Sequence, residues 1–253
     1  MISVVIPVFN EEAGLRATLD AVGRRFSTLG AGPFEIVVSD DGSRDGSVAL
    51  AEAMAGDWPI RVVRAGRNRG KGAAVRAGML VATGDPRLFF DADLSTPLDE
   101  TTRFLAALAG GADVAIGTRK HAAARIERPQ PWHRVQLGRS FTRLTNLLLG
   151  LDVSDFTCGF KAFRATAARA IFSRQRLDRW SFDAEILFLA RRLGLRVAEL
   201  PVRWSDRPDS RVRVASAVVQ SLLELVAIRR LARAGAYDAP AAESVSRDDR
   251  VPP

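Results

Sequence analysis

Short runs of β-branched and aromatic residues alternate with longer amphipathic segments through the first half of the chain. The runs predict strands over residues 3–9, 34–40, 60–65, 87–93 and 113–119. The helical spacing of apolar residues predicts helices between them, over residues 11–29, 43–55, 72–82 and 98–109. Strands that alternate with helices imply an α/β fold, with a mostly parallel sheet and helices on both of its faces.

The second half of the chain, after residue 120, follows a different pattern. A loop rich in Arg and Pro comes first, and amphipathic segments follow it. The elements expected here are helices over about residues 133–150, 182–194 and 214–235, and a strand over residues 196–204. From Ala236 on the sequence lacks periodicity, so we expect residues 236–253 to form a disordered tail.

The composition is that of a soluble globular protein. The 253 residues are 47% hydrophobic and 26% charged, which suffices for a full core in one domain of roughly 200 residues. Cys158 is the single cysteine, so no intramolecular disulfide can form, and no uncharged apolar run of about 18 residues is present. The N-terminal segment enters a strand pattern at once, without the features of a signal peptide, so the cytoplasm is the expected compartment.

Basic residues outnumber acidic ones by 37 to 29, which gives a net charge of +8. This excess favours an anionic partner, such as a nucleotide, a nucleic acid or an acidic membrane surface. A compositional bias toward Arg is the alternative explanation. A nucleic-acid-binding module is disfavoured, because only 7% of the residues are aromatic and carboxylates in the polar loops would repel a phosphate backbone.

Polar residues gather where the expected strands end. The carboxyl ends of parallel strands meet at one edge of a sheet, and ligands bind outside that edge. The segments that follow the five strands are Asn10–Glu12, Asp40–Ser43, Arg67–Gly72, Asp91–Asp93 and Arg119–Lys120. The sequence therefore predicts that five loops direct polar groups toward one site.

Asp91 and Asp93 follow the apolar run Leu88–Phe90 and stand two residues apart. Both side chains can turn toward one divalent cation, which cancels the repulsion between the two carboxylates. Mg²⁺ or Mn²⁺ that is held by two carboxylates and a substrate diphosphate needs few further protein ligands. A solvated turn is the alternative for such a triplet alone, but the preceding strand favours the metal site.

Two other loops suit a nucleotide. Asp40 or Asp41 could hydrogen-bond a base or a ribose, and Lys71, which stands between glycines, could meet phosphate through its backbone N–H and its ammonium. Ordinary turn and helix-cap chemistry is the alternative for either loop alone.

Seven blocks of the sequence follow one another in a characteristic order. They are "SVVIPVFNEE", "IVVSDDGSRDGS", "NRGKGAAVRAGM", "FFDADLSTP", "IGTR", "DFTCGFKAF" and "WSFDAEILFLARRLG". Together they resemble the family 2 inverting glycosyltransferases of the dolichyl-phosphate glucosyltransferase and dolichyl-phosphate mannose synthase group, over roughly residues 1–211. The resemblance implies a GT-A fold, which is Rossmann-like, a UDP- or GDP-sugar donor, Mg²⁺ or Mn²⁺ at the DxD motif, and a polyprenyl phosphate acceptor.

The resemblance also implies roles for individual residues. The nucleotide-sugar site would contain Pro7, Asn10, Glu12, Asp40, Asp41, Lys71, Asp91, Ala92 and Asp93. The metal would be held by Asp91 and Asp93, which with Asp155 would form the catalytic set. The acceptor phosphate would face Arg119, Arg139, Lys161, Arg207 and Arg211. The implied GT-A domain then has a nucleotide-sugar half to about residue 120 and an acceptor half over 121–211, with an amphipathic helix over 212–235.

The leading hypothesis is metal-dependent, inverting transfer of a hexose, glucose or mannose, from a UDP- or GDP-sugar to a polyprenyl phosphate. A phosphate monoester is largely ionised at neutral pH, so cations that position it matter more than a base. The alternative is a glycosyltransferase with a soluble hydroxyl acceptor. That reaction would need a general base, for which Asp155 is the candidate.

The expected helix over residues 133–150 combines a leucine face with several arginines, a pattern typical of helices that lie in a bilayer interface. Packing against the core is the alternative for this segment alone. With the second amphipathic helix and a lipid acceptor, we expect peripheral contact with the inner face of the cell membrane. Asp183 and Glu185 are further candidates for the site, and the sequence does not predict the oligomeric state.

Overall fold

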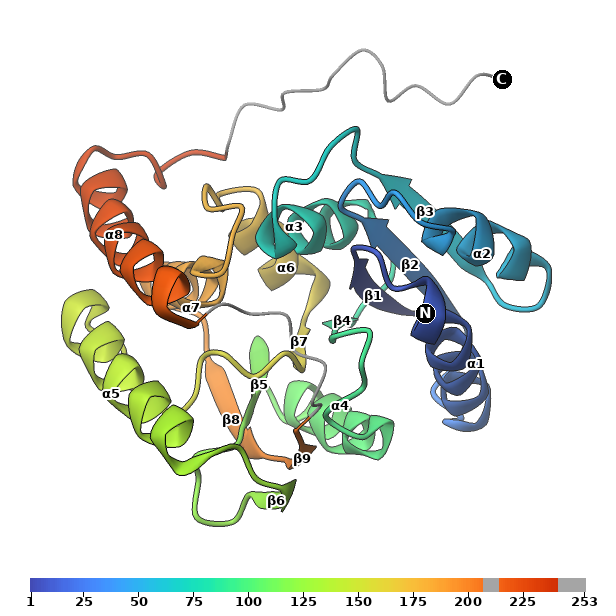
Figure 1. The fold of residues 1–253 in the computed structure, drawn as a ribbon, viewed down its shortest axis with the longest axis horizontal. Coiled ribbons are helices and arrows are strands. Elements are labelled where there is room, and N and C mark those ends of the chain that lie inside the picture. The colour runs from blue at the N-terminus through green and yellow to red at the C-terminus, as the bar shows by residue number, and fades with distance from the viewer. Residues whose placement is uncertain (207–213, 241–253) are drawn as a thin grey trace.

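A seven-stranded sheet forms the centre of the molecule (Figure 1). The structure is a computed structural model that describes residues 1–206 and 214–240. The first half contains β1 (Ile2–Val8), α1 (Glu12–Thr28), β2 (Phe34–Asp40), α2 (Ser47–Ala53), the 3₁₀ helix η1 (Met54–Gly56), β3 (Ile60–Arg64), α3 (Lys71–Val81), β4 (Arg87–Phe89), the 3₁₀ helix η2 (Leu98–Glu100), α4 (Thr101–Ala109) and β5 (Val114–Thr118). The second half contains β6 (Arg125–Arg128), α5 (Trp132–Leu149), β7 (Lys161–Phe163), α6 (Ala165–Phe172), α7 (Phe182–Arg192), β8 (Val197–Pro201), β9 (Arg203–Ser205) and α8 (Val214–Arg233).

The strand order in the sheet is β3-β2-β1-β4-β7-β5-β8. All neighbours pair in parallel except β7, which runs antiparallel to both β4 and β5. The five strands predicted in the first half are therefore confirmed, within a mostly parallel sheet. The segment 196–204, expected as one strand, instead divides into β8, which joins the central sheet, and β9, which pairs with β6 in a separate two-stranded sheet.

Helices cover both faces of the sheet, as the alternating pattern predicts. Alternate side chains of a strand point to opposite faces, and the two faces carry separate apolar clusters. Val5, Val37 and Phe89 pack with buried residues of α3, α6, α7 and α8, whereas Ile6, Val38 and Leu88 pack with α1, α2 and α4. In Figure 1, α5, α7 and α8 group at the opposite end of the molecule from α1 and α2.

The chain beyond α8 differs from the expectation of a disordered tail from residue 236. Tyr237 is 1% exposed. Its ring packs against Phe188 of α7, with 6.0 Å between ring centroids. The ordered structure thus continues to residue 240, and residues 241–253 lie outside the described part of the chain.

None of the helices within residues 1–206 and 214–240 combines the length and the apolar character that a bilayer crossing requires.

The close packing of α3 on β1 gives a prediction about stability. A Cβ at Gly78 would lie 2.4 Å from Cγ1 of Val5, so Gly78→Ala forces the helix away from the sheet. We expect a loss of about 1–3 kcal/mol in the free energy of unfolding, measured by urea denaturation. Gly14→Ala in α1 is the control, because no atom lies within 4 Å of the added Cβ. Equal effects of the two substitutions would contradict this account.

Candidate active site

The loops that follow β1 and β2 are tied together. The backbone N–H of Asn10 donates to Oγ of Ser43 at 2.9 Å, and the N–H of Arg44 donates to Oδ1 of Asn10 at 2.8 Å. Asn10 has φ of 56°, a left-handed conformation that asparagine tolerates better than most residues. Pro7 lies in β1 opposite Ser39 of β2, so it belongs to the strands that carry these loops.

Two predicted nucleotide-site carboxylates support these loops through backbone hydrogen bonds. Asp40 is buried and accepts from the N–H groups of Gly42 and Ser43, both at 3.0 Å. Glu12 accepts from the N–H of Gly46 at 2.8 Å. Its negative charge there interacts favourably with the partial positive charge at the N-terminus of α2. Turn and cap chemistry, the alternative for the Asp40 loop, is therefore the geometry observed there.

A pocket of about 550 Å³ opens between the ends of β1, β2 and β3. Its lining includes Phe9, Asn10, Asp40, Ser43, Arg44 and Asn68. This volume lies in the range of small-molecule sites, and the wall combines an aromatic ring with amide, hydroxyl and guanidinium groups. Asp40 and Asn10 thus both shape the pocket and face it.

Asp41 holds the loop that begins α3. Its carboxylate is 3% exposed and accepts from the backbone N–H groups of Arg69 at 2.9 Å and Gly70 at 2.8 Å. Burial raises the pKa of Asp41, although these two hydrogen bonds act in the opposite direction. Gly70 has φ of 123°, which a residue with a side chain rarely adopts, and this turn places Lys71 at the first position of α3.

Lys71 and Asp91 form an ion pair at the carboxyl edge of the sheet. Nζ of Lys71 lies 2.5 Å from Oδ1 of Asp91. Burial lowers the pKa of Lys71, but the carboxylates of Asp91 and Asp183 outweigh it, so the net pKa is raised and the ammonium stays charged. The other side of Asp91 lies against Gly159, where a Cβ would come within 2.1 Å of Oδ2.

Asp93 lies at the exposed end of the DxD motif. Its Oδ1 accepts from the N–H of Ser95 at 2.9 Å, and the carbonyl of Ala92 accepts from the hydroxyl of Thr18 on α1 at 2.6 Å. These bonds fix the motif while leaving carboxylate oxygens open to solvent. Among the residues that the structure describes, no group of three or more His, Cys, Asp or Glu side chains could enclose a metal ion. The carboxylate oxygens of Asp91 and Asp93 fit a hard cation that takes its remaining ligands from a bound diphosphate and water.

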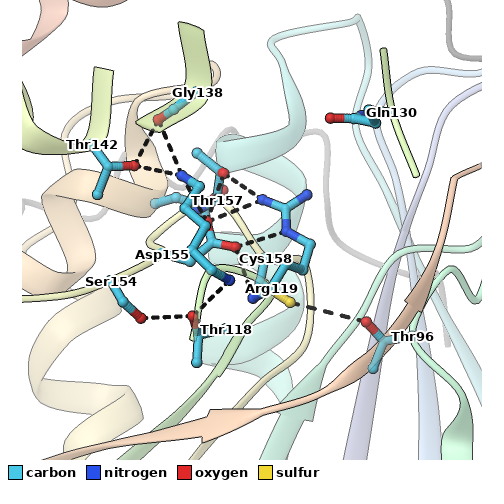
Figure 2. A network of polar contacts seen from close by, with 12 residues as sticks. Thr96, Thr118, Arg119, Gln130, Gly138, Thr142, Ser154, Asp155, Thr157 and Cys158 are labelled. Carbon is cyan, nitrogen blue, oxygen red and sulfur yellow. Dashed lines mark hydrogen bonds and ion pairs between the residues drawn. The ribbon is translucent and has the colours of Figure 1, made fainter. Parts of the chain in front are cut away.

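Asp155 lies at the centre of a second charged cluster, which is shown in Figure 2. Its carboxylate is 0% exposed and accepts from Nε of Arg119 at 2.7 Å and from Nη2 at 3.0 Å, with Nζ of Lys120 at 3.4 Å. Burial raises the pKa of Asp155, but the two cations outweigh this effect and hold it far below its usual range. A carboxylate in this state is a weak base.

The cations of this cluster connect β5 with α5. Nη2 of Arg119 also donates to Oγ1 of Thr157 at 2.7 Å, and Cζ of its guanidinium lies over the ring of Trp204, 5.3 Å from the centroid. Lys120 donates to the carbonyl of Gly138 at 3.1 Å, and burial together with the charges of Arg119 and Arg139 lowers its pKa. Arg139 is exposed on α5 and its charge acts on Lys120, so we group Arg119, Lys120 and Arg139 as one basic cluster. The sequence analysis named Arg119 and Arg139 as residues that would face the acceptor phosphate. It named Lys120 only as part of the polar loop after the fifth strand.

The structure corrects the prediction for Lys161. Its ammonium is 0% exposed, donates to Oδ1 of Asp183 at 2.5 Å and to the carbonyl of Cys158 at 2.6 Å, and lies over the ring of Phe89. Because the ammonium is fully buried and bound to Asp183 and Cys158, Lys161 does not face an acceptor, and Asp183 balances its charge. Arg207 and Arg211, also expected near the acceptor phosphate, lie outside the described residues.

A comparison with solved structures identifies the class of fold to which the protein belongs. A crystal structure of glucosyl-3-phosphoglycerate synthase from Mycobacterium tuberculosis, in complex with Mn²⁺, UDP-glucose and phosphoglyceric acid, matches with a TM-score of 0.65. The identity is 22%, and the match covers 96% of this chain and 81% of that one. The chain thus has the GT-A-like fold of a glycosyltransferase, as predicted.

Sequence comparisons identify the family. The model of glycosyl transferase family 2 matches residues 3–172, and the chain belongs to this family. Dolichyl-phosphate beta-glucosyltransferase of Drosophila melanogaster is 35% identical over 224 residues, which cover 83% of this chain and 69% of the relative. The human protein of the same name is 30% identical over 249 residues, which cover 93% and 77% of the two chains.

The buried cluster predicts how stability depends on pH. Asp155→Asn leaves Arg119 and Lys120 without their shared counter-ion, so we expect the free energy of unfolding to fall by about 3 kcal/mol at pH 7. The folded-state pKa of Asp155 is lowered, so its contribution is complete above the unfolded value near 3.9 and is lost as the pH falls below it. The difference between wild type and variant should therefore stay constant from pH 7 to about pH 5 and narrow as the pH falls below about 4, as measured by urea denaturation. The exposed Asp57→Asn is the control, and a difference that stays constant below about pH 4 as well would contradict the argument.

Proposed function

We propose that the protein transfers glucose from UDP-glucose to a polyprenyl phosphate of the dolichyl type, with inversion at the anomeric carbon. The observation that carries this proposal is the similarity to dolichyl-phosphate beta-glucosyltransferases over most of both chains. Mannose and GDP are less well supported, because the names of these relatives specify glucose and the solved neighbour was crystallised with UDP-glucose.

The donor would bind across the ends of β1, β2, β3 and β4. The pocket beside Asn10 and Asp40 suits the nucleoside, and the adjacent Lys71 supplies a permanent positive charge for the diphosphate. Asp91 and Asp93 would hold Mg²⁺ or Mn²⁺, which when bound acts as a Lewis acid for the departing nucleoside diphosphate. The Mn²⁺ in the solved neighbour supports a divalent cation.

The acceptor phosphate would bind the basic cluster of Arg119, Lys120 and Arg139. Such a phosphate is already largely ionised at neutral pH, so it can attack without a base. The weak basicity of Asp155 disfavours the alternative reaction on a soluble hydroxyl, because that reaction needs a group able to take a proton. Asp155 would instead orient Arg119 and Lys120 toward the acceptor.

Exposed apolar side chains on α5 and α8 support a lipid acceptor. Trp132 and Leu147 of α5 are 77% and 79% exposed, and Leu223 of α8 is 67% exposed. The two helices contact one another, so their exposed residues lie on neighbouring elements. Helices that combine such residues with arginines bind at a bilayer interface, and we propose that this surface meets the membrane.

Labelled sugar transfer tests the proposed reaction. Purified protein with UDP-[¹⁴C]glucose, polyprenyl phosphate and Mn²⁺ should move label into organic solvent, whereas label that stays in the aqueous phase would reject a lipid product. Asp93→Asn should lower the rate by about a hundredfold or more, because the amide is a poor ligand for a hard cation yet can still accept from the N–H of Ser95. The exposed Asp99→Asn is the matched control and should keep most of the activity.

Vesicle binding tests the membrane surface. A Leu147→Glu, Leu223→Glu double variant should sediment with anionic vesicles at least about tenfold less than the wild type, because two charges replace apolar contacts. Ala55→Glu, an exposed residue of η1, is the control for added negative charge. Equal sedimentation of the double variant and the wild type would remove α5 and α8 from the proposed surface.

A further inference from the structure

The segment that follows α8 returns to the interior of the protein. The hydroxyl of Tyr237 donates to Oε1 of Glu185 at 2.7 Å, and Tyr237 is 1% exposed. Burial and the negative charge of Glu185 raise the pKa of Tyr237, so the hydroxyl remains a donor. Nη2 of Arg176 donates to the carbonyls of Ala236 at 2.6 Å and Ala239 at 3.2 Å.

Glu185 joins this segment to the loop between α6 and α7. Its carboxylate is 0% exposed and accepts from the backbone N–H of Arg176 at Oε1 and of Leu177 at Oε2, both at 2.9 Å. With Tyr237, three donors therefore converge on one buried carboxylate. A carboxylate that binds two successive N–H groups fixes the path of the loop.

The same loop holds the segment that carries Lys71. The carbonyl of Asp178 accepts from the N–H of Ala73 at 3.0 Å, and the carbonyl of Gly72 accepts from Nε2 of Gln175 at 2.9 Å. The carboxylate of Asp178 pairs with Arg69 at 2.9 Å.

The fit between the loop and the start of α3 is tight. A Cβ at Gly70 would lie 2.6 Å from the carbonyl oxygen of Asp178, and one at Gly72 would lie 2.9 Å from that of Leu177. Such close packing transmits a displacement of the loop to α3, because there is no free space between them to absorb it.

We infer that Glu185 and Tyr237 are positioning residues for the sugar donor, acting through the loop 175–178 on the segment 69–73 and its Lys71. This inference rests on the proposed function, in which Lys71 meets the donor diphosphate. Neither residue lies among the donor ligands proposed above, so their effect on the donor passes through the contacts between the loop 175–178 and the segment 69–73. The inference gives the segment after α8 a role in the reaction.

The neighbouring ion pair offers a matched comparison. Asp238, one residue beyond Tyr237, pairs with Arg192 at the surface and has 61% of its side chain exposed. It anchors the same segment to α7 but makes none of the hydrogen bonds to the loop 175–178. Asp238→Asn therefore removes a surface ion pair of the segment, which contributes little to stability, without touching Glu185.

The test compares Tyr237→Phe, Glu185→Gln and Asp238→Asn in the full chain. We expect Tyr237→Phe to raise the Kd of UDP, measured by calorimetry with Mn²⁺, and the KM of UDP-glucose by roughly threefold to tenfold, with the KM of polyprenyl phosphate unchanged. Glu185→Gln should raise both constants further. Its amide NH₂ would face the backbone N–H of Arg176 or Leu177, and two donors cannot form a hydrogen bond. Amide hydrogen exchange of residues 69–73 should quicken in both variants, and Asp238→Asn should match the wild type in every readout.

Two results would overturn the inference. One is unchanged exchange of residues 69–73 in both Tyr237→Phe and Glu185→Gln, since the exchange measurement needs no ligand. The other is an equal loss of donor binding in Asp238→Asn, which would reveal a general loss of stability. Failure of the wild type to bind any nucleotide would instead reject the proposed function, while the exchange comparison would still decide whether Glu185 and Tyr237 hold the segment.

Discussion

The pairing of each carboxylate at the carboxyl edge with a cation or with backbone N–H groups is the interaction on which the site depends. Asp155 is fully buried, and an unpaired charge there would cost several kcal/mol, so Arg119 and Lys120 must lie beside it. Lys71 pairs with Asp91 in the same way, although the carboxylate of Asp91 remains partly exposed. In the proposed reaction these cations also meet the anionic substrates, so the pairs that stabilise the fold also arrange the groups for catalysis.

Much of the fold could be predicted because each parallel strand carries its own apolar run. The strand β7 was not predicted, since Lys161–Phe163 is only three residues long and its place depends on partners distant in sequence. Phe163 lies opposite Arg87 of β4 and Val114 of β5, a pairing that no local pattern indicates. A short strand between two others is therefore fixed by the sheet around it.

The location of the site could be predicted more fully than the orientation of its side chains. The five polar loops do meet at one edge, because parallel strands place their ends together. Lys161 was misjudged, because a strand sends residues i and i+2 to one face and Lys161 shares its face with the buried Phe163. Asp183, 22 residues on, supplies the negative charge that balances the buried ammonium. The role of Tyr237 had no signal in the sequence, since it follows the last periodic segment.

The proposed acceptor side of the site joins charge and apolar surface at one helix. Lys120 at the end of β5 donates to the carbonyl of Gly138 on α5, so the basic cluster is fixed to this helix. The same helix exposes the apolar side chains of Trp132 and Leu147, which become buried when an apolar partner such as a bilayer covers them. A helix that lies at a bilayer interface holds its cations at the depth of the lipid phosphates. In the proposed reaction, the contact that binds the membrane would therefore also bring the phosphate of a polyprenyl lipid to Arg119 and Lys120, and the enzyme need not extract its acceptor from the bilayer.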